Sequence, residues 1–239
     1  MNALLAAESI GKSFGTRNVL RTASVWAASG KITALLGRNG CGKTTLVKIT
    51  TGQLKPDHGV VIYDGQRMLR PRLHDLARAG LYYLPERNLL STAFTIRDHL
   101  DALYRLFPGA TIDRAIESLR IGEFLERKPQ TLSGGERRRC EAAIAVARNP
   151  RCLLADEPYM GIMPRDAMLL TNAFRKMAHI KGCAVLVTGH EVNTLLELAD
   201  DVIWQTAGTT HYLGTSEEAQ RHDQFRREYL GGTLRAPLT

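Results

Sequence analysis

Residues 37–45 constrain this chain more than any other segment, because they combine closely spaced glycines with a lysine and two threonines. The segment follows a short apolar run, Ile32–Leu36, and precedes a stretch with the pattern of a helix. Glycines let successive backbone N–H groups turn toward one anion, and the N-terminal end of the following helix adds a positive dipole. The order of strand, glycine-rich loop and helix therefore predicts an α/β fold with a phosphate-binding loop. The loop residues are Gly37, Arg38, Asn39, Gly40, Cys41, Gly42, Lys43, Thr44 and Thr45.

Two residues of this loop have distinct predicted roles. The Lys43 ammonium is expected to reach the β- and γ-phosphates of a nucleotide, and the Thr44 hydroxyl is expected to ligate magnesium. The alternative is a glycine-rich turn that caps a helix and carries a solvated lysine. The strand before the loop and the helix after it make that alternative the weaker one.

A second acidic element follows an apolar run at residues 152–155 and reads Asp156-Glu157-Pro158. Such a run is typical of a buried parallel strand whose carboxyl end lies near the first strand's loop, where ligands bind in open α/β sheets. We expect Asp156 to hold magnesium, directly or through water, and Glu157 to polarise the attacking water. The alternative is a pair of solvated carboxylates that close a core strand, and the phosphate loop upstream makes it less favourable.

A third motif, Leu132-Ser133-Gly134-Gly135-Glu136, predicts another anion-binding helix N-terminus. Read alone, it is an ordinary helix cap with a flexible approach. With the phosphate loop before it and Asp156-Glu157-Pro158 after it, the chain resembles the nucleotide-binding subunit of an ATP-binding cassette (ABC) transporter. The resemblance runs from about Leu4 to Gly231. It implies ATP and Mg²⁺ as cofactors and ATP hydrolysis as the activity.

The resemblance assigns roles to two further residues. Phe14 matches the aromatic residue that stacks on adenine in this family, and the alternative is a core-facing aromatic at the end of a strand. His190 follows the apolar residues 184–188 and matches the switch histidine that contacts the γ-phosphate. The alternative for His190 is a structural histidine after a strand.

Two positions depart from the family pattern. Glu86 stands where the family usually has a glutamine that faces magnesium and water. A carboxylate can still bind water or approach the metal, but it adds negative charge beside the triphosphate. The branched-chain amino acid ATPases of the family also have this glutamate, so it does not imply inactivation. Met163 stands where the family usually has an aspartate that signals across the dimer, which leaves coupling between subunits and the turnover rate open.

Within the family, the chain is most similar to single-cassette ATPases of the lipopolysaccharide-transport and branched-chain amino acid types. This similarity lies in residues 132–139, 157–162 and 226–231. Three consecutive arginines, at positions 137–139, either form one solvated helix face or make contacts, and the sequence favours neither interpretation.

The resemblance implies a P-loop NTPase fold of ABC type, with a mostly parallel core sheet, an antiparallel β subdomain and an inserted α-helical subdomain. Periodicity predicts strands at residues 4–10, 19–27, 32–36, 59–63, 81–84, 152–156, 184–188 and 202–205. A capping box from Thr95 to Asp98 predicts a helix through Leu106, and another helix is expected from about Arg165. We expect one domain over residues 1–239. Its core and antiparallel layer are residues 1–86 and 151–239, and its helical subdomain, with the Ser133 motif, is residues 87–150.

Composition restricts the function classes further. The chain has 239 residues, 44% of them hydrophobic, which suits one sizeable core. No stretch approaches 18 consecutive apolar residues and residues 1–5 lack the basic region of a signal peptide, so a cytoplasmic protein is expected. The net charge of +8 favours anionic partners, but the basic residues are scattered, which argues against nucleic acid. Neither cysteines nor histidines show metal-ligand spacing, so the nucleotide's magnesium is the only metal expected.

The resemblance also implies partners. In the family two cassettes pair head to tail, so Ser133 and Gly135 of one subunit are expected to contact the γ-phosphate held by Lys43 of the other, identical or different, subunit. Transmembrane permease subunits are expected near the Glu86 loop and the helical subdomain, with the chain peripheral on the cytoplasmic face of the membrane. Two alternatives remain: a soluble ABC ATPase of an assembly or nucleic-acid process, and a regulatory module with weak hydrolysis, to which Glu86 and Met163 would point. The transported substrate and its direction belong to the membrane subunits.

Overall fold

A single sheet connects the whole molecule, and its strands follow the order β5-β4-β1-β2-β10-β9-β3-β8-β7-β6. This arrangement comes from a computed structural model, which describes residues 3–87 and 89–231. The ends of the expected domain, residues 1–2 and 232–239, lie outside the described residues, as does Asn88. So does part of the segment on which the signal-peptide expectation depends.

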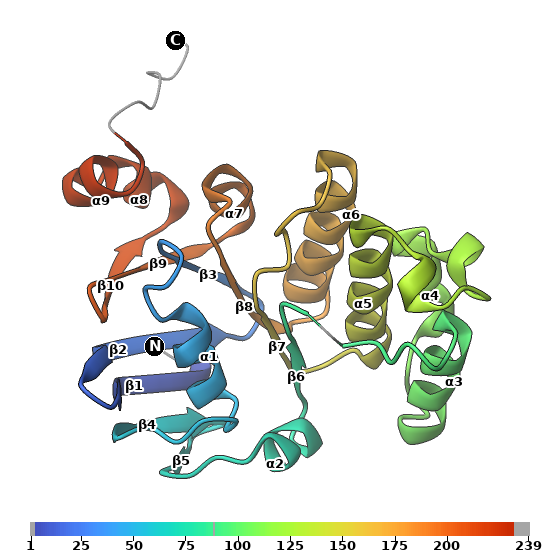
Figure 1. The fold of residues 1–239 in the computed structure, drawn as a ribbon, viewed down its shortest axis with the longest axis horizontal. Coiled ribbons are helices and arrows are strands. Elements are labelled where there is room, and N and C mark those ends of the chain that lie inside the picture. The colour runs from blue at the N-terminus through green and yellow to red at the C-terminus, as the bar shows by residue number, and fades with distance from the viewer. Residues whose placement is uncertain (1–2, 88, 232–239) are drawn as a thin grey trace.

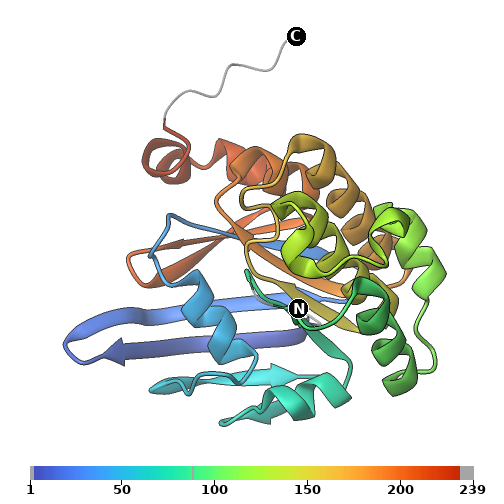
Figure 2. The ribbon, with the colours of Figure 1, turned by 45° about the vertical axis from the view of Figure 1, so that its right-hand side comes forward.

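The antiparallel layer predicted from the first thirty residues is confirmed, with longer strands than expected. It contains β1 (Ala3–Phe14), β2 (Arg17–Ala28), β4 (His58–Tyr63) and β5 (Gln66–Met68). Asp64 and Gly65 connect β4 to β5 and both have positive φ, the conformation of a tight hairpin turn. Figure 2 shows the β1–β2 hairpin extending away from the helices on the opposite side of the molecule.

The parallel part of the sheet is also as expected. It contains β3 (Ile32–Leu36), β6 (Leu81–Leu84), β7 (Cys152–Ala155), β8 (Ala184–Gly189) and β9 (Asp201–Thr206). Alternate side chains of these strands enter two different hydrophobic clusters. On β7, Leu153 and Ala155 belong to one cluster, and Cys152 and Leu154 belong to the other. Burial on both faces is the reason that these strands read as continuous apolar runs.

The helices divide between the two clusters. Helix α1 (Lys43–Thr50) packs in the cluster that also contains the antiparallel strands. The other cluster lies between the parallel strands and a group of helices at the right of Figure 1. That group comprises α3 (Ile96–Leu106), α4 (Ile112–Leu119), α5 (Gly134–Arg148) and α6 (Pro164–Arg175).

Local signals explain where these helices begin and end. The predicted capping box is present, because the Thr95 side chain accepts from the Asp98 N–H and the Asp98 carboxylate accepts from the Thr95 N–H. The break at Pro108 separates α3 from α4, and a 3₁₀ turn, Pro129–Thr131, precedes α5. A π-helical turn, Lys176–Ile180, extends α6.

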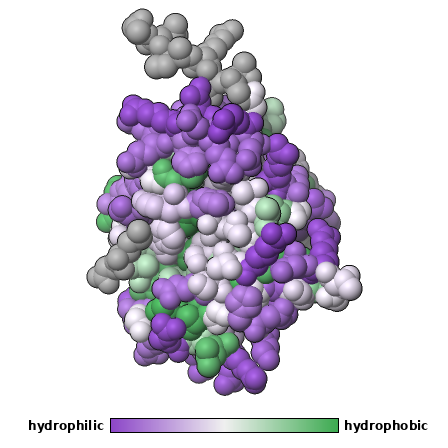
Figure 3. Space-filling view, turned by 90° about the vertical axis from the view of Figure 1, so that its left-hand side faces the viewer, coloured by the Kyte–Doolittle hydropathy of each residue, from purple (hydrophilic) through white to green (hydrophobic). Residues whose placement is uncertain are grey.

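Several elements were not predicted. They are β5, α2 (Leu73–Arg78), α7 (Val192–Leu198), β10 (Thr209–Gly214), α8 (Ser216–Arg221) and α9 (Asp223–Glu228). Helices α8 and α9 lie at the top of Figure 3, where hydrophilic side chains dominate the surface. Within residues 3–87 and 89–231, no helix is long and apolar enough to cross a membrane.

Candidate functional site

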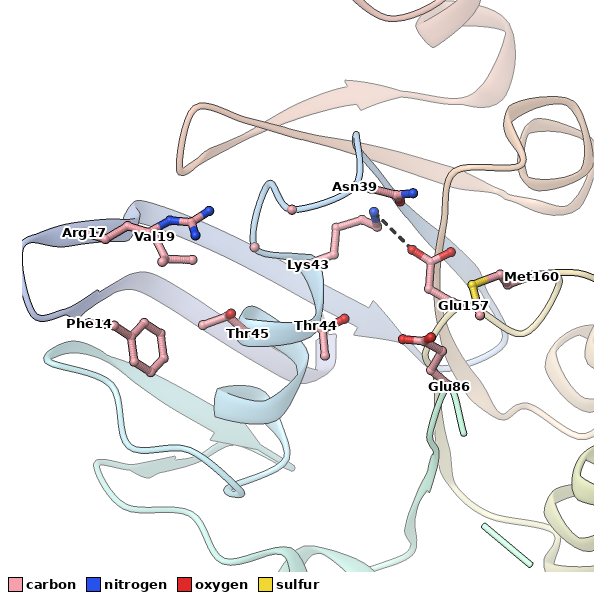
Figure 4. A pocket seen from close by; sticks show the side chains of 12 residues that line it. Phe14, Arg17, Val19, Asn39, Lys43, Thr44, Thr45, Glu86, Glu157 and Met160 are labelled. Atoms are coloured by element: carbon pink, nitrogen blue, oxygen red, sulfur yellow. Dashed lines mark ion pairs between the residues drawn. The ribbon is translucent and has the colours of Figure 1, made fainter. Parts of the chain in front are cut away.

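A cavity of about 530 Å³ lies at the carboxyl ends of the parallel strands and brings together half of the predicted site residues. Figure 4 shows its side chains converging from the phosphate loop, β1, β2 and the loops after β6 and β7. Its lining consists of Phe14, Arg17, Val19, Asn39, Gly40, Gly42, Lys43, Thr44, Thr45, Glu86, Glu157 and Met160.

The phosphate loop connects β3 to α1 through backbone conformations that favour glycine. Gly40 and Gly42 have φ of 79° and 105°, where an L side chain would be strained. At Gly42 a Cβ would also lie 2.9 Å from Gln205 Nε2 and 3.0 Å from Leu20 Cδ2. The glycine spacing is therefore required by both the backbone and the packing behind it.

Lys43 is the first residue of α1 and is almost completely buried. Its ammonium donates to the Gly37 carbonyl oxygen at 2.8 Å and lies 3.1 Å from Glu157 Oε1. A buried ammonium needs such partners, because leaving it unpaired would cost several kcal/mol. A bound phosphate would compete with Glu157 for this cation.

Glu157 follows β7 in the strained left-handed region, with φ of 46°. The Thr188 hydroxyl links it to its neighbour, because it accepts from the Glu157 N–H at 3.0 Å and donates to Asp156 Oδ1 at 2.6 Å. The Tyr83 hydroxyl donates to Asp156 Oδ2 at 3.4 Å. Asp156 is fully buried, so these hydrogen bonds fix the direction of its carboxylate and hold the backbone of Glu157.

His190 lies beside Glu157, as its position after β8 predicts. Its Nδ1 is 3.0 Å from Glu157 Oε2, and its Nε2 is 3.6 Å from Glu191 Oε1. Ligand atoms of these three residues lie within 4.8 Å of one another. The Lys43 ammonium already compensates the Glu157 charge, and imidazole is not a ligand that magnesium prefers.

The residues expected to hold magnesium offer hard oxygen donors. Thr44 and Glu86 line the cavity, and Asp156 lies at the end of the strand that leads to Glu157. A hydroxyl, carboxylates and water form the donor set that Mg²⁺ takes, so the residues fit this ion. The Glu86 carboxylate is only partly exposed and pairs with Arg87 Nε at 3.0 Å, which offsets part of the charge that the departure from glutamine adds.

Phe14 ends β1 at the far side of the cavity from Glu157 (Figure 4). The structure contradicts the core-facing alternative, because 49% of the residue is exposed. The Lys12 ammonium lies 5.6 Å from the centre of the ring and pairs with Asp57 at 2.8 Å. That hydrogen bond from Lys12 is the main reason that the pKa of Asp57 lies below its usual value.

The four motif residues Ser133, Gly134, Gly135 and Glu136 lie at the start of α5. Ser133 and Glu136 form a capping box, and the backbone N–H of Ser133 holds the pKa of Glu136 below its usual value. A Cβ on Gly135 would lie 2.2 Å from Asp166 Oδ2. None of the four is among the described residues that line the cavity.

The back of the phosphate loop contacts the C-terminal helix α9. Gly37 donates its N–H to the Tyr229 hydroxyl at 3.1 Å, and Arg38 donates to the Glu228 carbonyl at 2.5 Å. Arg38 and Cys41 line a second cavity of about 420 Å³ on this side, rather than the first cavity. Burial raises the pKa of the Cys41 thiol.

Some residues around the site were missed at the level of sequence. Arg17, Val19 and Met160 line the cavity, while Thr188 and Tyr229 act through hydrogen bonds. Thr188 lies two residues before His190. The two-residue period of a strand could therefore have indicated that Thr188 lies on the same face as His190. The other contacts depend on pairing between distant segments.

Met163, the second departure from the family pattern, is 71% exposed at the N-cap position of α6. A methionine there provides neither charge nor a capping hydrogen bond.

Known proteins resemble this chain over most of its length. Residues 20–160 match the family model described as ABC transporter. The chain is 32% identical over 236 residues to the lipopolysaccharide export system ATP-binding protein LptB of Haemophilus influenzae, covering 96% of this chain and 98% of that protein. A solved ATP-binding subunit of an ABC transporter superposes with a TM-score of 0.81 at 23% identity, over 96% of this chain and 97% of that one. A dimeric cassette in a post-hydrolysis state with ADP and phosphate superposes with a TM-score of 0.75 at 22% identity, over 87% of this chain and 98% of that one.

Proposed function

This chain belongs to the ABC transporter family as an ATP-binding and ATP-hydrolysing subunit that works with membrane partners, and we propose which of its residues perform these steps. The observation that carries the proposal is the Lys43–Glu157 pair at 3.1 Å, which joins the start of α1 to the loop after β7 in one cavity. This pair joins the phosphate-binding element to the carboxylate that faces the attacking water.

Nucleotide binding is proposed to use the full length of the cavity. Phe14 stacks on adenine, the loop from Gly37 to Thr45 surrounds the phosphates with its N–H groups, and Lys43 neutralises the terminal phosphates. The exposed ring of Phe14 and the inward direction of Lys43 support this orientation.

Hydrolysis is proposed to depend on Glu157 and His190. When the γ-phosphate takes over the Lys43 ammonium, the Glu157 carboxylate becomes available to orient and polarise water. His190, 3.0 Å from Glu157, contacts the γ-phosphate from the other side of that carboxylate. Glu86 holds a second water or a metal-bound water at the cavity wall.

Magnesium is proposed to bind to Thr44 and Asp156, with Glu86 close by. When bound, the ion neutralises charge that develops on the β- and γ-phosphates. The buried Asp156 carboxylate, held by Thr188, supports this assignment.

The motif at Ser133 is proposed to complete the nucleotide site of a second cassette. Its position at a helix N-terminus outside the chain's own cavity supports a head-to-tail pair, in which Ser133, Gly134, Gly135 and Glu136 meet the partner's γ-phosphate. ATP then stabilises the pair, and hydrolysis weakens it.

The transported substrate is proposed to be of the lipopolysaccharide class, from the similarity to the LptB protein. We propose that permease subunits dock near the Glu86 loop and a helical subdomain of residues 87–150, which is inserted in the core formed by residues 1–86 and 151–239. The chain is placed on the cytoplasmic face of the membrane, where ATP is available.

The test is ATP hydrolysis by the purified chain over a range of protein concentrations, with and without magnesium. We expect a rate per subunit that rises with concentration, and that is lost on chelation of magnesium and in Lys43→Ala. A chain that binds ATP but does not hydrolyse it, alone or with permease subunits, would instead support a regulatory module.

A further inference from the structure

Arg138 lies one turn into α5, close after the Ser133 motif, and its side chain is only 6% exposed. The interpretation of residues 137–139 as one solvated face is therefore wrong for this residue. A buried guanidinium is costly unless its donors are satisfied, so its partners show what it is there to hold.

The partners of Arg138 are mainly backbone carbonyls of two distant loops. Nη1 donates to the Pro85 oxygen at 2.7 Å, Nη2 to the Asp156 oxygen at 3.0 Å, and Nε to the Pro158 oxygen at 3.1 Å. Its charge is compensated by Glu141 Oε2, 2.8 Å from Nη1. A planar group with five N–H donors can satisfy all four acceptors at once, whereas a lysine cannot.

Each carbonyl belongs to a neighbour of a proposed site residue. Pro85 precedes Glu86, while Asp156 and Pro158 are the residues on either side of Glu157. We propose that Arg138 is a positioning residue that holds the Glu86 and Glu157 loops in register with the helix that carries Ser133. This inference rests on the proposed function, because it assigns to one side chain the regulation of the same ATPase site.

The backbone of Glu157 explains why such a residue is needed. A glutamate with φ of 46° persists only where its surroundings hold it there. Arg138 holds the carbonyls of both flanking residues, and Thr188 holds the Glu157 N–H. A shift of α5, for example when Ser133 meets a partner's nucleotide, is transmitted through the guanidinium to the carboxylate that orients water.

Another arginine on the same helix provides a matched control. Arg148 is partly buried, donates to the Ala77 carbonyl at 3.5 Å, and lies over the Phe107 ring. Arg148→Lys makes the same chemical change as Arg138→Lys, at the end of α5 remote from Ser133.

The experiment compares wild type, Arg138→Lys and Arg148→Lys by ATP affinity, steady-state ATPase kinetics and amide hydrogen exchange. In Arg138→Lys we expect kcat to fall by about 100-fold, the size typical of a misplaced catalytic group. The Kd for ATP should stay within about threefold of the wild-type value, because the contacts that bind ATP equally in the ground state and the transition state are unaffected. Exchange should become faster at Glu86 and Glu157 but not in α1, and Arg148→Lys should match wild type in all three measurements.

A second variant covers loss of folding. If Arg138→Lys does not fold, Arg138→Met combined with Glu141→Gln removes both buried charges and leaves no unpaired carboxylate. The same pattern is expected from it.

Two results would overturn the proposal: a kcat equal to wild type, or a loss of kcat accompanied by an equal loss of ATP affinity and faster exchange in α1. If wild type hydrolyses no ATP, alone or with permease subunits, the proposed function fails. The exchange comparison at Glu86 and Glu157 still decides the role of Arg138 in that case.

Discussion

At the scale of single residues, the contacts of Glu157 distinguish this site most. Its carboxylate lies between the Lys43 ammonium and the His190 ring, and its backbone is strained. A buried carboxylate that is held by two cationic or polar neighbours is already oriented before any nucleotide binds. Its removal should therefore affect the chemical step more than the binding of ATP.

Glu157→Gln tests this separation. The amide keeps the size of the side chain but cannot accept a proton from water, so we expect kcat to fall by at least about 100-fold. The Kd for ATP should remain within about threefold, because the loop and Lys43 are intact. Full ATPase activity in the variant would show that Glu157 does not have the assigned role.

Cys41 offers a pH-dependent test of the loop. Burial raises the pKa of Cys41 above the ordinary value. Near pH 8 the fraction of Cys41 present as thiolate is therefore smaller than that of a free thiol. We expect maleimide or iodoacetamide to modify Cys41 at least about fivefold more slowly than glutathione at pH 8, with the pH midpoint of the rate shifted upward. Mass spectrometry locates the label, and Cys41→Ser is the control. A rate equal to that of glutathione would contradict the buried environment.

Sequence reasoning at this scale succeeds where a residue's chemistry is local. The glycines of residues 37–45 and the carboxylates after β7 could be identified because their spacing along the chain is enough to indicate phosphate and metal binding. Arg138 could not, because its contacts with Asp156 and Pro158 join segments about 20 positions apart, which only the tertiary fold brings together.

At the scale of elements, α9 supports the phosphate loop from behind. The Tyr229 hydroxyl accepts the Gly37 N–H, and the ring stacks on Phe225 with centroids 5.3 Å apart. Burial raises the pKa of Tyr229 to about 12, so its hydroxyl stays neutral at physiological pH. The end of α9 thus contacts the phosphate loop without lining the first cavity.

Tyr229→Phe tests this support. Loss of the hydroxyl leaves the Gly37 N–H without its acceptor, and we expect the Kd for ATP to rise about fivefold, the equivalent of ~1 kcal/mol for one hydrogen bond. Tyr212→Phe is the matched control, because the Tyr212 hydroxyl donates to Asp201 on β9 instead. Calorimetric titration of both variants decides the point, and equal affinities in the two would remove α9 from the site.

The elements that could be predicted are those with a strong pattern. Strands β3, β7 and β8 are apolar on both faces, and α3 has a capping box. Strand β10 and helices α8 and α9 were missed because few of their residues are buried and most are polar. Their position is set by pairing with β9 and by packing of Phe225 on Trp204. The periodicity of the sequence carries no information about either contact.

At the scale of the whole molecule, the phosphate loop and the Ser133 motif are separate elements, and only the loop lines the cavity. The cavity lies at the ends of β3 and β7. Ser133 is the N-cap of α5 and is not among the described residues that line this cavity. On the proposed function, one chain carries two incomplete halves of a site. Two copies arranged head to tail would complete both, with ATP between them.

The mass of the ATP-bound protein tests this central claim most directly. Light scattering of Glu157→Gln with ATP and magnesium should change from the 26.5 kDa of one chain to twice that mass, and Lys43→Ala should prevent the change. Adding Ser133→Arg to Glu157→Gln should abolish the doubling while ATP binding is kept, because only the partner's site is blocked. A mass that stays at one chain with saturating ATP, or that doubles despite Ser133→Arg, would contradict the head-to-tail pair.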